Sequence, residues 1–192
     1  RTTSQSDPSK DVMEEQGSRG GNIDHEPSDA GAGTAASAGS LSLERAVGRM
    51  IMTGYLGAYP SQEVLRRARA GEIGGVILMG ENVGPRTKEA ISALQQAPKS
   101  GTGHALVVAT DQEGGSVKRF PQVGPYVPAA KISAGTARAQ GRATGQGLAA
   151  VGVNTDLAPV GDVGHAGTFM SDRTFSSSAA AAAQSACAFA AG

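Results

Sequence analysis

Hydrophobic and polar positions along the chain follow a helical period in some stretches and form short continuous apolar runs in others. Apolar residues recur every three or four positions through residues 43–56, and Ser42 is placed to cap the free N–H groups of a first turn. We therefore expect a helix there. A second helix is expected over residues 61–71, with Ser61 as its cap and Gly71 as its stop.

Three later apolar runs lack a helical period and are bounded by glycine or polar residues, which is typical of buried parallel strands. These runs are IGGVILMGENVG (73–84), HALVVAT (104–110) and GVNTDLAPVGDV (152–163), the last including an exit loop. Helices are expected between and after them, over residues 86–97, where Pro98 would end the helix, from about 129 to 151, and over 176–192.

This alternation of strand and helix predicts an α/β fold with parallel strands and about three βα units. Right-handed crossovers would bring the carboxyl ends of the strands, and the loops after them, to one face. The polar stretches GENVG, DQEGGSVKR and APVGDVGHAGTFMSDRTF all follow a predicted strand. Sites in parallel α/β folds collect at that face, so we look for the chemistry there.

Residues 1–40 differ in composition from residues 41–192. They contain seven Ser, six Gly, seven acidic and three basic residues, but only three large apolar side chains. Such a segment cannot bury enough apolar surface to offset its ordering entropy, so we expect a disordered tail or linker. As a tether it favours a secreted or cell-envelope location; the alternative is a leader without function.

Charge and cysteine content remove several classes of function. The chain has 17 basic and 17 acidic residues, so its net charge gives no reason to expect nucleic acid or an anionic membrane as partner. A single cysteine, Cys187, allows neither an internal disulfide nor a cysteine metal site. No apolar run approaches the ~18 residues of a transmembrane helix. The glycines of GRATGQG (141–147) fall inside a predicted helix, which argues against a nucleotide-binding loop.

The segment after the second predicted strand, DQEGGSVKRF, holds two candidate ligand-binding residues. Asp111 would lie at the carboxyl end of that strand, where an ionised carboxylate accepts strong hydrogen bonds from sugar hydroxyls. Arg119 would hold Asp111 or Glu113 in place, or reach the ligand itself. Loop-shaping salt bridges are the alternative interpretation of Glu113 and Arg119.

Arg173, in SDRTF after the third predicted strand, is the third candidate. Its guanidinium would offer paired donors to a ligand, with Asp172 as a possible orienting partner. A surface ion pair is the alternative. Asp162 is expected to order its loop, and His165 is the one histidine expected on the same face.

Three of these motifs, DQEGGSVKR, GVNTDLAPVGDV and DRTFSSS, resemble in order and spacing the N-terminal barrel of glycoside hydrolase family 3. A fourth, GGVILMGENV, is similar to the bacterial β-N-acetylhexosaminidase branch of that family. The resemblance covers roughly residues 43–192 and implies part of a TIM (β/α)₈ barrel. Lys118 and the serines after Phe175 depart from the family pattern without removing a ligand-contacting side chain.

The resemblance implies that Asp111 and Arg173 bind the nonreducing-end sugar, and that Arg119 is the arginine closing the acid-glycine motif. It implies a carbohydrate substrate with a β-linked amino sugar, and neither a metal nor an organic cofactor. The later family motifs, which carry the nucleophile and the acid/base residues, have no match here. The expectation is therefore the front part of an exo-acting retaining β-N-acetylhexosaminidase, with no catalytic residue in this chain.

Two other functions stay open at this point. A β-glucosidase-like member of the same family would share these motifs. A short protein that binds sugar or a partner without catalysis is the alternative from another class.

Overall fold

The computed structural model describes residues 41–192, so the predicted tail over residues 1–40 lies outside the described residues. The helices are α1 (Leu43–Gly48), α2 (Gln62–Ala70), α3 (Thr87–Lys99), α4 (Ala134–Val151) and α5 (Ala179–Ala190). The strands are β1 (Met52–Thr53), β2 (Gly75–Leu78), β3 (Val107–Thr110), β4 (Gln112–Gly114), β5 (Val117–Lys118) and β6 (Thr155–Asp156). Two short 3₁₀ turns, Gly80–Asn82 and Ala129–Lys131, complete them.

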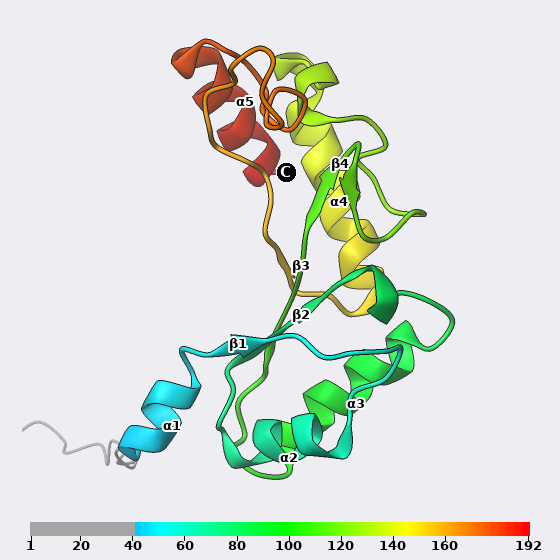
Figure 1. Ribbon diagram of the computed structural model, residues 1–192, viewed down its shortest axis with the longest axis vertical. Coiled ribbons are helices and arrows are strands. Elements are labelled where there is room, and N and C mark those ends of the chain that lie inside the picture. Colours follow the sequence, from blue (N-terminus) through cyan, green and yellow to red (C-terminus); the bar gives the residue numbers. More distant parts are fainter. Residues whose placement is uncertain (1–40) are drawn as a thin grey trace, which may run out of the picture. The chain divides into compact units, whose positions relative to one another are not determined.

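A four-stranded parallel sheet in the order β1-β2-β3-β6 forms the centre of this part of the chain (Figure 1). Leu78 of β2 lies opposite Thr110 of β3, and Thr110 lies opposite Asp156 of β6. Strands β2, β3 and β6 therefore end at the same level, so the loops that follow them leave from one end of the sheet. The prediction of an α/β fold with parallel strands is confirmed.

Local sequence explains where α2 begins and ends. The Ser61 hydroxyl accepts a hydrogen bond from the N–H of Val64 at 3.3 Å, which satisfies one of the free donors of the first turn. Gly71 then adopts the left-handed conformation, with φ of 78°, that ends many helices. Both residues act as the sequence predicted.

Helix α3 packs beside α2 (Figure 1) and supplies much of the core. Its Leu94 is completely buried in a cluster with Val76 and Leu78 of β2. The expected stop at Pro98 is wrong, because Pro98 lies inside the last turn and α3 continues to Lys99. Proline lacks only its own N–H donor, and the helix ends one residue later.

The single helix expected over residues 43–56 is wrong. Helix α1 ends at Gly48, and Met52 and Thr53 form the edge strand β1, paired with Gly75 and Val76 of β2. A short apolar run fits either period, and here Met52 and Thr53 pair with β2 in the sheet instead of continuing the short helix α1. The sheet thus has four strands where three were expected.

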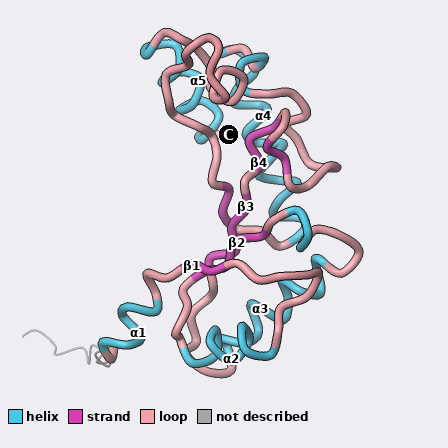
Figure 2. The backbone as a smooth tube through the Cα atoms, in the orientation of Figure 1, coloured by secondary structure: helices cyan, strands magenta, loops and turns pink. Residues whose placement is uncertain are grey.

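The strands are also shorter than the apolar runs that predicted them, and loops take up the remainder (Figure 2). DQEGGSVKR, expected as a loop, contains the antiparallel hairpin β4-β5. Side chains after β3 are therefore held by a second small sheet.

Helices α4 and α5 pack closely on each other (Figure 1). A methyl group on Gly141 would collide with the carbonyl oxygen of Phe189, so only glycine permits this approach. This confirms that GRATGQG belongs to a packed helix. No helix among residues 41–192 has both the length and the apolar character needed to cross a bilayer.

Candidate functional site

The candidate site lies at the carboxyl ends of β3 and β6. Asp111 directly follows β3, and Asp156 is the last residue of β6. Because Thr110 and Asp156 are register partners in parallel strands, both acids lie at the same edge of the sheet. This is the end of the sheet at which the sequence analysis predicted the ligand-binding site.

The hairpin β4-β5 fixes the chain that leaves Asp111. Gly114 and Gly115 have φ of 93° and 58°, which side-chain-bearing residues adopt only with strain. Gln112 is completely buried, and its amide group donates to three carbonyl oxygens while accepting the N–H of Phe120. The chain that carries Arg119 is therefore attached to β4 by buried hydrogen bonds.

Arg119 pairs with Asp111 across this hairpin. One guanidinium nitrogen of Arg119 lies 3.2 Å from the Asp111 carboxylate. The two side chains are 31% and 23% exposed, respectively, so both can still meet a ligand. The arginine holds the carboxylate in position and leaves some of its lone pairs free to accept further hydrogen bonds.

Arg173 reaches the same place from the loop between β6 and α5. Its Nε and one terminal nitrogen donate to the two oxygens of Glu113, at 2.7 and 2.6 Å. The Glu113 side chain is only 7% exposed, whereas that of Arg173 is 25% exposed. This hydrogen-bonded pairing raises the pKa of Arg173 above its ordinary value. Glu113, not the expected Asp172, orients the arginine.

The structure therefore brings Asp111, Arg119 and Arg173 together. The two ion pairs share the short segment from Asp111 to Glu113, and the Asp111 charge acts on the Arg173 guanidinium. Arg173 also lies over the exposed ring of Phe169, with 5.9 Å from the guanidinium carbon to the ring centre. A carboxylate, two guanidinium groups and an aromatic face are the groups that bind hydroxyl-rich ligands.

Asp156 is a site residue that the sequence analysis did not select. Its Oδ1 accepts the backbone N–H of Gln112 at 3.0 Å, and its buried Oδ2 has no hydrogen-bond partner among residues 41–192. Burial raises the pKa of Asp156 to about 7; the Gln112 N–H opposes this, and the charges of Asp111 and Glu113 add to it. The only sequence feature that could have identified Asp156 is its position in the third predicted strand segment, residues 152–163.

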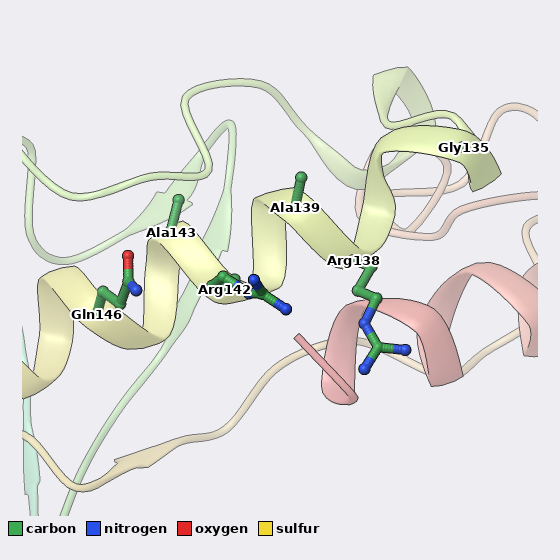
Figure 3. A pocket seen from close by; sticks show the side chains of 6 residues that line it. All are labelled: Gly135, Arg138, Ala139, Arg142, Ala143 and Gln146. Carbon is green, nitrogen blue, oxygen red and sulfur yellow. The ribbon is translucent and has the colours of Figure 1, made fainter.

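Two hollows have linings that do not include these ion pairs. One, of about 440 Å³, runs along α4 (Figure 3), and its lining residues are Gly135, Arg138, Ala139, Arg142, Ala143 and Gln146. The other, of about 300 Å³, lies in the loop before α5 and includes His165 and Thr174. Neither lining contains Asp111, Arg119 or Arg173. Within residues 41–192 no group of three His, Cys, Asp or Glu side chains is placed to hold a metal ion.

These observations define a class: a parallel α/β protein with a polar, partly open site at the carboxyl ends of its strands. The sequence profile described as "Glycosyl hydrolase family 3 N terminal domain" matches residues 42–192. The chain belongs to glycosyl hydrolase family 3, whose N-terminal domain is a TIM-barrel-like α/β fold. The fold prediction of a partial (β/α)₈ barrel and the resemblance to this family are both confirmed.

Curated relatives carry glycosidase names. An "Uncharacterized secreted glycosyl hydrolase" of Arthroderma benhamiae is 34% identical over 69% of this chain and 39% of its own length. A "Beta-hexosaminidase" of Xanthomonas oryzae pv. oryzae is 28% identical over 66% of this chain and 41% of its own. The chain thus spans about two fifths of the length of these relatives.

Solved structures agree in fold. The β-N-acetylhexosaminidase from Beutenbergia cavernae superposes with a TM-score of 0.68 and 34% identity, over 79% of this chain and 50% of that one. A family 3 β-N-acetylglucosaminidase from Paenibacillus sp. gives a TM-score of 0.70 at 24% identity, over 78% of this chain and 30% of that one, a likeness of fold.

Proposed function

We propose that the full-length protein carrying residues 41–192 is an exo-acting retaining β-N-acetylhexosaminidase, and that this segment supplies its sugar-binding side. The observation that carries the proposal is the meeting of Asp111, Arg119 and Arg173 at the carboxyl ends of neighbouring parallel strands. Family membership and the β-hexosaminidase names of relatives support the reaction and the amino-sugar substrate.

In this proposal each charged group has a defined task. Asp111 accepts hydrogen bonds from hydroxyls of the nonreducing-end sugar, and Arg119 holds its carboxylate in place. Arg173, fixed by Glu113 through two bonds, turns its remaining N–H groups toward the sugar oxygens. Fixing both groups before the ligand arrives lowers the ordering cost of binding.

Bond cleavage is assigned to other residues of the full-length protein. A retaining glycosidase needs a nucleophile and an acid/base partner about 5–5.5 Å apart across the scissile bond. Asp111 and Glu113 are each engaged by an arginine, which suits binding rather than proton transfer. The proposal gives residues 41–192 no catalytic residue.

Two alternatives make different predictions. A β-glucosidase-like member of the family would prefer glucosides over N-acetylglucosaminides. A non-catalytic sugar-binding protein would bind N-acetylglucosamine and hydrolyse neither substrate.

The test compares Asp111→Ala with the unaltered full-length protein on a chromogenic N-acetyl-β-glucosaminide and the matching glucoside. We expect kcat/KM on the N-acetylglucosaminide to fall about 100-fold, because hydrogen bonds to a charged group contribute ~1.5–3 kcal/mol each. Asp162→Ala is the matched control. Asp162 was expected to order its loop, but it is exposed and takes part in no side-chain hydrogen bond or ion pair among residues 41–192, so this variant should keep its rate.

Circular dichroism of both variants establishes that they fold. A folded Asp111→Ala variant with an unchanged rate would refute the assigned role. A preference for the glucoside would favour the first alternative, and sugar binding without hydrolysis would favour the second.

A further inference from the structure

Asp156 is a partly buried acid, with one fully buried carboxylate oxygen, that the proposed sugar contacts do not use. It ends β6 and accepts the N–H of Gln112, the residue next to the sugar-binding carboxylate of Asp111. This bond joins the end of β6 to the start of the β4-β5 hairpin, which follows β3, the neighbour of β6 in the sheet. Asp156 is therefore connected to Asp111 by one hydrogen bond to the residue next to it.

The second oxygen of Asp156 has an unusual environment. Oδ2 is buried and has no hydrogen-bond partner among the residues that the structure describes. An ionised oxygen in such a place loses its hydration without compensation, whereas a protonated one removes the charge. The geometry alone favours the neutral acid.

The charged groups around Asp156 favour the same state. Asp111 and Glu113 face it from the segment after β3, and their partners are Arg119, after β5, and Arg173, before α5. Each arginine is already engaged by one of the other two carboxylates. An ionised Asp156 would therefore add a negative charge that has no cation of its own.

We propose that Asp156 is a positioning residue which, in its protonated form, holds Asp111 in place for the sugar, and that loss of this proton weakens sugar binding. The proposal rests on the function proposed above and adds a regulation of the same site by pH. In the protonated acid, Oδ1 still accepts the Gln112 N–H. Without a charge on Asp156, Asp111 keeps its ion pair with Arg119 undisturbed.

The direction of the pH effect follows from the site. Burial raises the pKa of Asp156 to about 7, so the acid is neutral below that pH and ionises as the pH rises through it. Ionisation sets a third carboxylate against Asp111 and Glu113. Sugar affinity should fall over the same range, and bound sugar should in turn raise the proton affinity of Asp156, because the coupling is reciprocal.

The experiment uses the full-length protein and three variants. Asp156→Asn keeps an oxygen for the Gln112 N–H but cannot ionise, whereas Asp156→Ala loses both properties. Asp162→Asn is the control, because it neutralises an exposed acid of the adjoining loop. Calorimetry measures the affinity for N-acetylglucosamine between about pH 5.5 and about pH 8.5, well below and above a pKa near 7.

For the unaltered protein and for Asp162→Asn, we expect affinity to fall about tenfold across this range, the size of one unit of pKa coupling. Asp156→Asn should bind N-acetylglucosamine at every pH as tightly as the unaltered protein does at low pH. Its affinity should not fall as the pH rises. Asp156→Ala should bind more weakly at every pH. An Asn variant that keeps the decline, or that binds no better than the Ala variant, would overturn the proposal.

Infrared difference spectra of the ligand-free proteins separate this proposal from the function on which it rests. The band of a protonated carboxylic acid should disappear near neutral pH in the unaltered protein and be missing from Asp156→Asn. Persistence of that titrating band in Asp156→Asn would overturn the proposal even if the sugar binds. Failure of every variant to bind or hydrolyse the sugar, with the band behaving as expected, would instead refute the proposed function.

Discussion

The ion pair between Arg173 and Glu113 is the most constrained contact of the site at the scale of single residues. The two parallel bonds of 2.7 and 2.6 Å need a planar fork, which lysine lacks. In Arg173→Lys we expect KM for the N-acetylglucosaminide to rise about tenfold or more, because loss of one charge-assisted bond costs ~1.5–3 kcal/mol. Steady-state kinetics of the full-length protein measure this.

Arg86→Lys is the control for that substitution. Arg86 makes the same two-pronged contact with Glu89, but both side chains are more than half exposed, at 54% and 59%. Exposed pairs contribute ~0–1 kcal/mol, so this variant should match the unaltered protein. Equal effects of the two substitutions would contradict the role given to Arg173.

Some of the contacts between site residues could be predicted from the sequence, and others could not. The sequence narrowed the acidic partner of Arg119 to Asp111 or Glu113, because all three residues lie in one short motif, and the structure selects Asp111. The partner of Arg173 could not, since Glu113 is 60 positions away and the nearer Asp172 offered an equally charged alternative. The raised pKa of Asp156 depends on burial, which the sequence does not display.

At the scale of elements, the contact between α4 and α5 depends on the absence of a side chain at Gly141. A methyl group there would collide with the carbonyl oxygen of Phe189. We expect Gly141→Ala to lower the free energy of unfolding by about 2 kcal/mol, within the range of overpacked core positions. Urea denaturation of the full-length protein measures the change.

Gly145, one turn further along α4, is the matched control. A methyl group at this position meets nothing within 4 Å. Gly145→Ala should therefore stabilise the protein by about 0.5–1 kcal/mol, because alanine favours a helix more than glycine does. A Gly141→Ala variant as stable as Gly145→Ala would contradict the packing described here.

Element prediction succeeded where several signals coincided. Helix α2 has a cap, a helical period and a terminal glycine, and the structure places both ends as expected. It failed at β1, because the apolar residues after α1 satisfy a helical and an extended pattern equally, and the deciding partner, β2, lies more than 20 positions along the chain.

At the scale of the whole molecule, the sheet described by residues 41–192 has two open edges. Neither β1 nor β6 has a strand neighbour on its outer side among these residues. Large apolar side chains near β1 are exposed as well, with Met50 at 87% and Leu56 at 86%. Open edges and apolar surface favour association with other chains.

We therefore predict that the isolated 192-residue polypeptide associates or unfolds without a cooperative transition. Light scattering and a thermal melt followed by circular dichroism measure both properties. A monomer with a sharp, reversible melt would contradict this prediction, while leaving the site geometry unaffected.

The central claim is that residues delivered by separate parallel strands bind one sugar. A crystal structure of the full-length protein with N-acetylglucosamine tests it most directly. The account predicts Asp111 and Arg173 within hydrogen-bonding distance, about 2.6–3.2 Å, of oxygens on the same sugar ring. A sugar bound elsewhere, or one contacted by neither residue, would contradict it.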